Sequence, residues 1–211
     1  MAVQFHEVAF AVPLIALALV AFLEGRLRAA VAWAAALVFV KEDLGLTVAV
    51  FGLVMAWRPP RGSGEGETSA LQRERRLLGL GLVAWGAAWF VLATYVILPA
   101  FNPAGEYAYT DRLAGLLNFF VPAEKGLTLL MLVTSAGLVG LRSPLVLVTL
   151  PTLIWRFIGN VPAYWGHSWH YSAVLMPMVF AALLDGMEGQ PVLRRRWLPP
   201  LLAAATTLAL G

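Results

Sequence analysis

The sequence predicts an all-α integral membrane protein, a polytopic helix bundle that forms a single domain over residues 1–211. Hydrophobic residues make up 60% of the chain, charged residues only 13%, and the mean hydropathy is +0.78. A soluble core of this size does not need that much apolar surface. The apolar residues also fall into long runs, which suit a bilayer whose hydrocarbon core is about 30 Å thick.

About seven to eight apolar segments follow one another, and most are predicted helices because of their length and their Leu, Ala and Val content. The second segment reaches only about 18 Å at about 1.5 Å per residue, so it cannot cross the bilayer alone. It must form a hairpin with the third segment or join it as one interrupted helix. The segments are Val8–Leu23, Ala29–Val40, Leu44–Trp57, Leu77–Pro99, Gly126–Leu141, Leu145–Gly159, Ser172–Met187 and Leu198–Gly211.

The distribution of basic residues decides between these two arrangements. In a hairpin with Lys41-Glu42-Asp43 at its tip, 11 of the 15 Lys and Arg residues fall on one side of the membrane. Lys and Arg concentrate in cytoplasmic loops, so the sequence predicts the hairpin and a multi-pass topology. The basic residues left on the outer side are Lys41, Arg112, Lys125 and Arg156.

The pI of about 9.6 therefore reports orientation and indicates no nucleic-acid partner, because most arginines lie in short loops beside apolar runs. Cysteine is absent, which excludes disulfides, thiolate metal sites and thiol nucleophiles.

The tripeptide Lys41-Glu42-Asp43 is the strongest functional signal. Three adjacent ionisable residues at membrane depth cost roughly 2.5 to 3.5 kcal/mol each, so they must face a cavity, a partner or the membrane edge. We expect a polar cleft that opens outward; the alternative is a self-paired charge cluster that ends a helix. The other polar residues expected on this side are His6, Glu7, Glu106, Asp111, Arg112, Glu124, Lys125, Arg156, His167 and His170.

Aromatic residues and histidines crowd the predicted outer loop 161–171. The aromatic residues fit two roles, an interfacial belt or a stacking surface for a sugar ring or an isoprenoid's polar end. His167 and His170, three residues apart, would hold a divalent metal ion together with Glu7 or Asp43. Two histidines without a fixed third ligand leave the metal unassigned.

Four motifs carry a resemblance to a known family: Gln4–Pro13, Val40–Leu46, Leu150–Leu153 and His170–Pro177. They resemble successive motifs of the domain-of-unknown-function 2079 family, bacterial and archaeal polytopic membrane proteins grouped with the GT-C glycosyltransferase superfamily. The resemblance runs from about Gln4 to Met187. It implies a GT-C-like helical fold in the bacterial cytoplasmic membrane, acting on a lipid-phosphate-linked sugar at the outer face.

The chain resembles the C-terminal half of the family's pattern, so we expect it to be incomplete at the N-terminus relative to that family. The superfamily's usual catalytic acidic residue would then precede Met1. The partners implied by the resemblance are a polyprenyl-phosphate sugar donor, membrane lipids and a separately encoded N-terminal half.

Transfer from such a donor needs a carboxylate to deprotonate the acceptor, and cations or a metal to steady the leaving phosphate. The resemblance thus implies catalytic roles for Glu42, Asp43 and His170. It implies substrate-binding roles for His6, Glu7, Lys41, Arg112, Lys125, Arg156 and Tyr171. The competing hypotheses are a transporter or channel, for which the sequence shows no internal repeat, and a non-catalytic subunit of a split enzyme.

Overall fold

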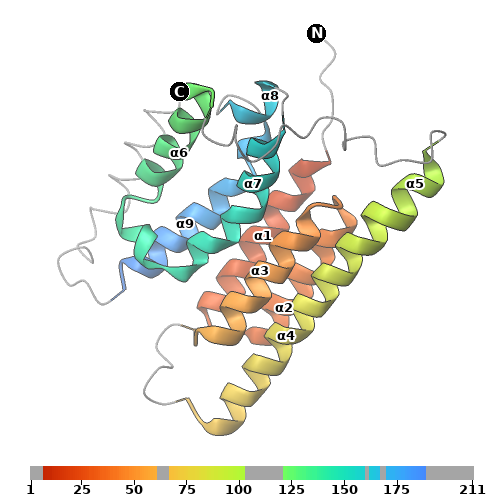
Figure 1. The fold of residues 1–211 in the computed structure, drawn as a ribbon. Coiled ribbons are helices and arrows are strands. Elements are labelled where there is room, and N and C mark those ends of the chain that lie inside the picture. Colours follow the sequence, from red (N-terminus) through yellow and green to blue (C-terminus); the bar gives the residue numbers. More distant parts are fainter. Residues whose placement is uncertain (1–6, 61–66, 103–120, 160–161, 167–169, 189–211) are drawn as a thin grey trace.

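The computed structural model describes residues 7–60, 67–102, 121–159, 162–166 and 170–188, and the regular elements in these ranges are helical. Helices α1 (Val8–Leu23), α2 (Leu27–Ala36) and α3 (Leu44–Trp57) form the centre of the bundle. Figure 1 shows the long α4 along one side of this group and α6 to α9 along the other. The predicted segment Leu198–Gly211 lies outside the described residues.

Helix α1 has the predicted bounds and ends in a hydrogen-bonded turn at Gly25. This glycine has φ +76°, a left-handed conformation that a residue without a Cβ adopts at little cost. The amide of Gly25 donates to the carbonyl of Phe22 at 3.0 Å, and the amide of Arg26 donates to that of Ala21 at 2.8 Å. This pair of bonds is the Schellman motif, which lets the chain reverse directly into α2.

Helix α2 continues into a short 3₁₀ turn, η1 (Leu37–Phe39), before the chain reverses into α3. Two contacts establish the reversal. Nε of Arg28, in α2, donates to Glu74 at 2.9 Å, and Nη1 of Arg75 donates to the carbonyl of Met55, late in α3, at 2.8 Å. The start of α2 and the end of α3 therefore both lie beside the first turns of α4. The structure shows the predicted hairpin, and the alternative of one interrupted helix was wrong.

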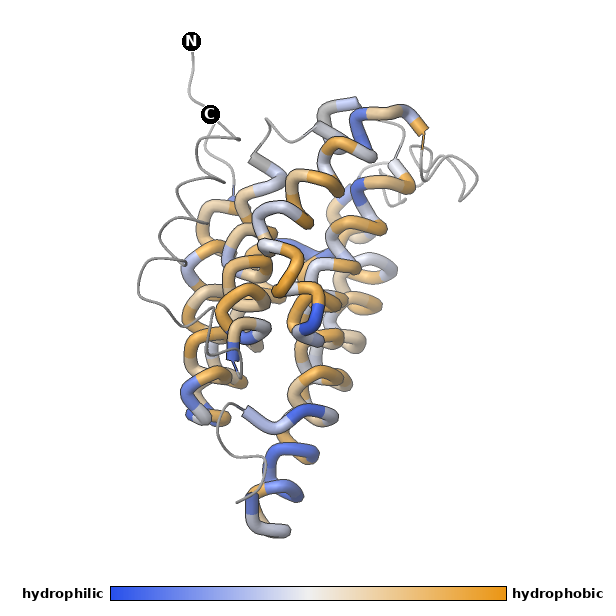
Figure 2. The backbone as a smooth tube through the Cα atoms, turned by 90° about the vertical axis from the view of Figure 1, so that its left-hand side faces the viewer, coloured by the Kyte–Doolittle hydropathy of each residue, from blue (hydrophilic) through white to orange (hydrophobic). Residues whose placement is uncertain are grey.

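Helix α4 (Ser69–Leu92) runs through a π-helical turn, η2 (Ala93–Ile97), into α5 (Leu98–Phe101). In the described part of the chain, this continuous helix of 33 residues alone is long and apolar enough to cross a membrane. It begins eight residues before the predicted Leu77, at a polar start that Figure 2 shows as hydrophilic. The side chain of Thr68 caps this start by accepting from the amide of Leu71 at 3.4 Å.

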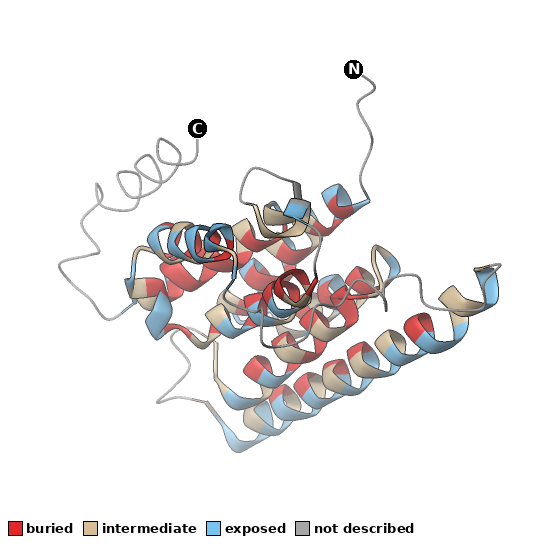
Figure 3. Ribbon diagram, turned by 45° about the horizontal axis from the view of Figure 1, so that its top comes forward, coloured by how far each residue is buried: buried red, intermediate tan, exposed pale blue. Residues whose placement is uncertain are grey.

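Helices α3 and α4 approach each other closely because glycines face each other. A Cβ on Gly79 would lie 2.6 Å from the carbonyl oxygen of Gly52, and one on Gly45 would lie 2.7 Å from that of Gly86. The outer face of α4 stays exposed along its length, as Figure 3 shows. The hairpin is therefore packed backbone to backbone against a long apolar helix.

The second half of the described chain is less regular than predicted. The segment predicted at Gly126–Leu141 is an α-helix followed by a 3₁₀ turn, and the one at Leu145–Gly159 begins as 3₁₀ helix. Pro144 and Pro151 cannot donate backbone hydrogen bonds, and each stands at the start of a helical stretch. The elements are α6 (Ala123–Ser135), η5 (Val139–Arg142), η6 (Pro144–Thr149), α7 (Leu150–Ile158), α8 (Pro162–Trp165), η7 (His170–Ser172) and α9 (Leu175–Gly186).

The core lies where α1, α3, η6 and α9 meet. Phe22 and Phe51 pack edge to face at its centre, with ring centroids 5.7 Å apart. Contacts of α3 with η6 and α7 hold the two halves of the described chain together. The hairpin tip, the start of α1 and the end of α7 consequently lie at one end of the bundle, which we call the pocket end. The start of α4 lies at the other, the arginine end.

Candidate functional site

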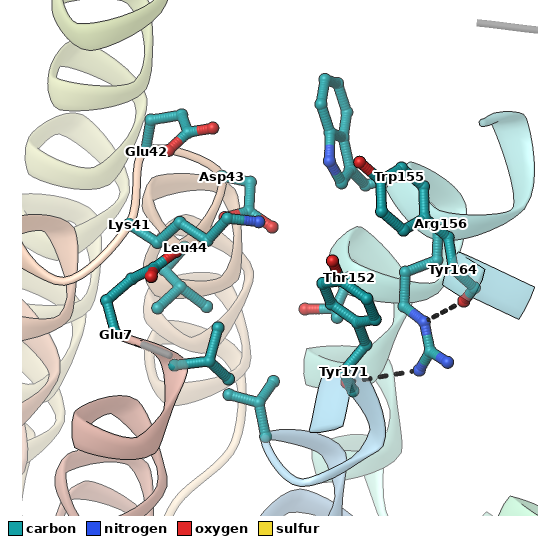
Figure 4. Close-up of a pocket in the computed structure, with 12 residues that line it drawn as sticks. Glu7, Lys41, Glu42, Asp43, Leu44, Thr152, Trp155, Arg156, Tyr164 and Tyr171 are labelled. Carbon is teal, nitrogen blue, oxygen red and sulfur yellow. Dashed lines mark hydrogen bonds and ion pairs between the residues drawn. The ribbon is translucent and has the colours of Figure 1, made fainter. Parts of the chain in front are cut away.

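A cavity at the pocket end lies between two walls of different chemistry. Glu7 and the hairpin tip form one wall, and side chains from α7 and the segment after it form the other (Figure 4). Its empty volume is about 760 Å³, including the opening. The lining residues are Glu7, Val8, Lys41, Glu42, Asp43, Leu44, Thr152, Trp155, Arg156, Tyr164, Tyr171 and Val174.

Asp43 is the central polar group of the first wall. It directly precedes α3, but its side chain caps no amide of that helix. The residue is 8% exposed, and its Oδ1 accepts no hydrogen bond from any described residue. Oδ1 lies 3.5 Å from Nζ of Lys41, and the two side chains form an ion pair. Burial raises the pKa of this turn carboxyl, Lys41 opposes the rise, and Glu42 adds to it.

Glu7 and Glu42 complete the acidic wall. Glu7 is exposed just before α1, and Glu42 is half-buried in the turn beside Asp43. The structure thus brings together three carboxylates and Lys41 around one cavity. Thr152 of the lining also lies close to a second buried hydroxyl, because its Oγ1 is 3.4 Å from that of Thr47.

Arg156 forms part of the second wall, but its guanidinium binds backbone rather than facing the carboxylates. Nε donates to the carbonyl of Tyr164 at 2.7 Å, and Nη1 donates to that of Tyr171 at 3.3 Å. Nη2 reaches the carbonyl of Gly166 at 3.2 Å and the hydroxyl of Ser172 at 3.4 Å. Figure 4 shows the guanidinium directed toward this loop. Arg156 therefore holds the chain that presents the aromatic residues.

The aromatic residues Trp155, Tyr164 and Tyr171 face the carboxylates across the cavity (Figure 4). The two tyrosine rings pack edge to face with centroids 5.1 Å apart. This contact orients both rings within the wall. This wall therefore presents three aromatic rings, two of which carry hydroxyl groups.

Lys125 lies outside the cavity lining. It is buried on α6, where its Nζ donates to the carbonyl of Phe157 at 2.7 Å and lies 4.6 Å from the centre of the Trp165 ring. Trp165 in turn donates to the carbonyl of Gly159 at 2.7 Å. These contacts satisfy the C-terminal end of α7, so they support the wall from behind.

Other predicted site residues fall outside the described residues, namely His6, Glu106, Asp111, Arg112 and His167. The backbone of His170 belongs to η7, two residues before the end of that turn. Among the described residues, no group of three His, Asp or Glu side chains is placed to hold a metal ion.

Thr152 lies in the motif Leu150–Leu153, but neither Thr152 nor Trp155 was predicted to be a site residue. A signal for both exists in hindsight, because Thr152, Trp155 and Arg156 are spaced to share one face of a helix. Of this face, only Arg156 was a predicted site residue.

Comparison with curated proteins found no match, and comparison with solved structures found none either. One family model, described as "Predicted membrane protein (DUF2079)", matches residues 1–211. This match agrees with the motifs that span the hairpin tip and α9. It covers the whole chain, and the chain therefore belongs to the DUF2079 family of predicted membrane proteins.

Proposed function

We propose that the cavity binds a polyprenyl-phosphate-linked sugar and supports glycosyl transfer at the outer face of a bacterial cytoplasmic membrane, in a chain that crosses it several times. The observation that carries the proposal is Asp43, more than nine-tenths buried in a cavity wall with an oxygen that accepts no hydrogen bond from a described residue. Such a group costs free energy unless a ligand donates to it.

The chemistry assigns Asp43 as the base. It takes the proton of an acceptor hydroxyl, whose oxygen attacks the anomeric carbon of the sugar. The bond from that carbon to the phosphate oxygen breaks, and polyprenyl phosphate leaves with the bonding electrons. A carboxyl with a raised pKa accepts a proton more readily than an ordinary one. Lys41, beside it, supplies positive charge for the departing phosphate.

The opposite wall supplies recognition of the sugar. Trp155 and the tyrosine pair offer flat apolar faces, while Glu42 and Glu7 offer acceptors for sugar hydroxyls. Arg156 acts as a positioning residue, because its guanidinium holds the carbonyls of both tyrosines. Lys125 supports the same wall through Trp165 and contributes no cation to the cavity lining.

Binding of the donor is the first test, with the full chain in proteoliposomes and a panel of polyprenyl-phosphate hexoses. We expect Lys41→Gln to weaken binding about tenfold or more, because a charge-assisted contact to phosphate is lost. Arg73→Gln is the matched control, since Arg73 is an exposed cation at the arginine end. Equal binding by wild type and Lys41→Gln would contradict the proposal.

Turnover is the second test. Asp43→Asn keeps the shape of the side chain but removes the base, so we expect transfer to fall by about 10² or more while donor binding is kept. Folding is monitored by thermal unfolding of the same preparations. Donor binding without transfer in the wild-type chain would favour the alternative of a non-catalytic subunit that works with a separately encoded half.

A further inference from the structure

A second built site lies at the arginine end, far from the cavity. Asp185 of α9 is 3% exposed and accepts hydrogen bonds from the hydroxyl of Ser143 and from Nη1 of Arg58. The hydroxyl of Ser143 also accepts from the amide of Leu145 at 3.1 Å, which fixes the turn into η6. A buried carboxylate thus places the guanidinium of Arg58 between the end of α3 and the start of η6.

An open pocket adjoins this carboxylate, with an empty volume of about 630 Å³ that includes open solvent. Its lining contains two guanidinium groups and no carboxylate. Arg142 is exposed and forms no ion pair with any described residue. The positive charge of Arg142 is therefore not compensated within the described part of the chain. The lining residues are Trp57, Arg58, Pro59, Arg142 and Pro144.

The rim of this pocket is apolar toward the middle of the bundle. Trp57 is 73% exposed, and Leu53, one turn earlier on the same face of α3, is 51% exposed. Leu141, beside Arg142, is exposed as well. Positive charge at the end of the helices, with exposed apolar side chains one turn further in, matches a phospholipid: phosphate at the interface and acyl chains below it.

We propose that this pocket binds the headgroup phosphate of an anionic glycerophospholipid from the cytoplasmic leaflet. Guanidinium groups bind phosphate oxygens through paired N–H donors, and Asp185 holds one of them in place. The end of the bundle that carries Arg58 and Arg142 also carries the first turns of α4, with the exposed Arg73 and Arg76. Anionic lipid is the charge complement of such a surface.

The test uses the purified full chain in detergent, titrated with phosphatidylglycerol or phosphatidylcholine and followed by native mass spectrometry. We expect Arg142→Gln to weaken phosphatidylglycerol binding about fivefold, the effect of one basic residue at an anionic lipid surface. Arg142→Lys should keep most of the binding, because it keeps the charge. Arg73→Gln, an exposed arginine of the same end outside this pocket, should bind like the wild type.

Three results would contradict the proposed lipid site. Arg142→Gln could bind phosphatidylglycerol as tightly as the wild type, or Arg73→Gln could lose as much affinity as Arg142→Gln. Alternatively, soluble glycerol 1-phosphate could compete at the same concentration as the lipid, which would make the site one for free phosphate. Phosphatidylcholine should bind all variants equally, because its headgroup carries no net charge. The outcome is independent of donor binding at the other end.

Discussion

Oδ1 of Asp43 lies 3.5 Å from Nζ of Lys41 across the hairpin tip, and no described residue donates a hydrogen bond to that oxygen. Lys41 is close enough to attract the carboxylate electrostatically, but this leaves Oδ1 without a hydrogen-bond donor among the described residues. Asp43 caps no amide of α3, and its ion pair with Lys41 is the contact that a self-paired cluster would also form. The titration of this carboxyl is measurable by comparing the wild type with Asp43→Asn.

The first prediction concerns the pH dependence of Asp43. Burial raises its pKa above the ordinary 3.8, so the folded protein binds this proton more tightly than the unfolded chain does. Relative to Asp43→Asn, the wild type should gain stability as the pH falls through the raised pKa toward 3.8. Thermal unfolding of both proteins across this window measures the difference. A difference that does not change with pH would contradict the assigned burial effect.

The second prediction concerns Arg75, which closes the end of α3. Its guanidinium donates to the carbonyls of Met55 and Ala56 at 2.8 Å each and binds both oxygens of Glu67. Arg75→Met should lower the free energy of unfolding by about 1–3 kcal/mol, because buried carbonyls lose their donors. The exposed Arg73→Met, on the same turn of α4, should change it by less than about 0.5 kcal/mol.

The contribution of the Arg75–Glu67 ion pair to stability should depend on pH in the opposite sense to that of Asp43. The hydrogen bond from Arg75 lowers the pKa of Glu67 below the ordinary 4.5. This stabilisation is present above the unfolded pKa and is lost as the pH falls through the lower folded pKa. The stability difference between the wild type and Glu67→Gln should therefore shrink below about pH 4.5. Denaturant titrations at several pH values measure it.

The bounds of α1 and α3 were predicted to the residue because charges adjoin their apolar runs. Glu24 directly follows α1, and Asp43 directly precedes α3. The start of α4 was predicted too late, because no apolar run marks it. Its first two turns are polar, and hydropathy detects apolar surface rather than a helix that begins at a capping Thr68.

The meeting of Glu7, the hairpin tip and Arg156 was predictable, because the hairpin topology sends all of them to one end. The hydrogen-bond partners of Arg156 were not predictable. Its partners are mostly backbone carbonyls of residues 164–171, and every residue type carries a carbonyl. Lys125 was misplaced similarly, since its acceptor is the carbonyl of Phe157. Sequence patterns predict which charged residues lie at the same end of the bundle. Which of these side chains bind backbone carbonyls depends on the folded structure.

The third prediction tests the contact between α3 and α4. Gly79→Ala should lower the free energy of unfolding by about 1–3 kcal/mol, because the new Cβ meets the carbonyl of Gly52 at 2.6 Å. Gly81→Ala is the matched control on the same helix, where a Cβ meets nothing within 4 Å. The control should be neutral or stabilising by up to about 1 kcal/mol, the difference in helix propensity. If both variants lowered the free energy of unfolding equally, the close approach of α3 and α4 at Gly79 would be contradicted.

The fourth prediction tests the orientation in the membrane. The chain has no cysteine, so single cysteines can be labelled without background. Glu124→Cys lies beside Lys125 at the pocket end and should react with an impermeant thiol reagent in intact cells. Ser69→Cys, at the start of α4, should react only after the membrane is opened. Labelling of Ser69→Cys in intact cells would overturn the orientation derived from the arginines.

The last prediction separates an enzyme from a carrier, and it depends on what lies beneath the cavity. Thr152 of the cavity lining contacts the hydroxyl of Thr47, and the described buried side chains around Thr47 are apolar, among them Ile15, Val48 and Phe51. An ion that leaves the cavity inward meets no charged side chain in this layer, so its barrier is high.

We therefore expect proteoliposomes of the wild-type chain to bind a polyprenyl-phosphate hexose and to show no ion or solute flux above empty vesicles. Lys41→Ala should weaken donor binding and leave the flux at the same background, because Lys41 faces the cavity and not the apolar layer. A carrier needs no lipid-linked donor. Robust flux that persists in Lys41→Ala would mean that solutes cross by a path through the bundle, and the glycosyltransferase proposal would then fail.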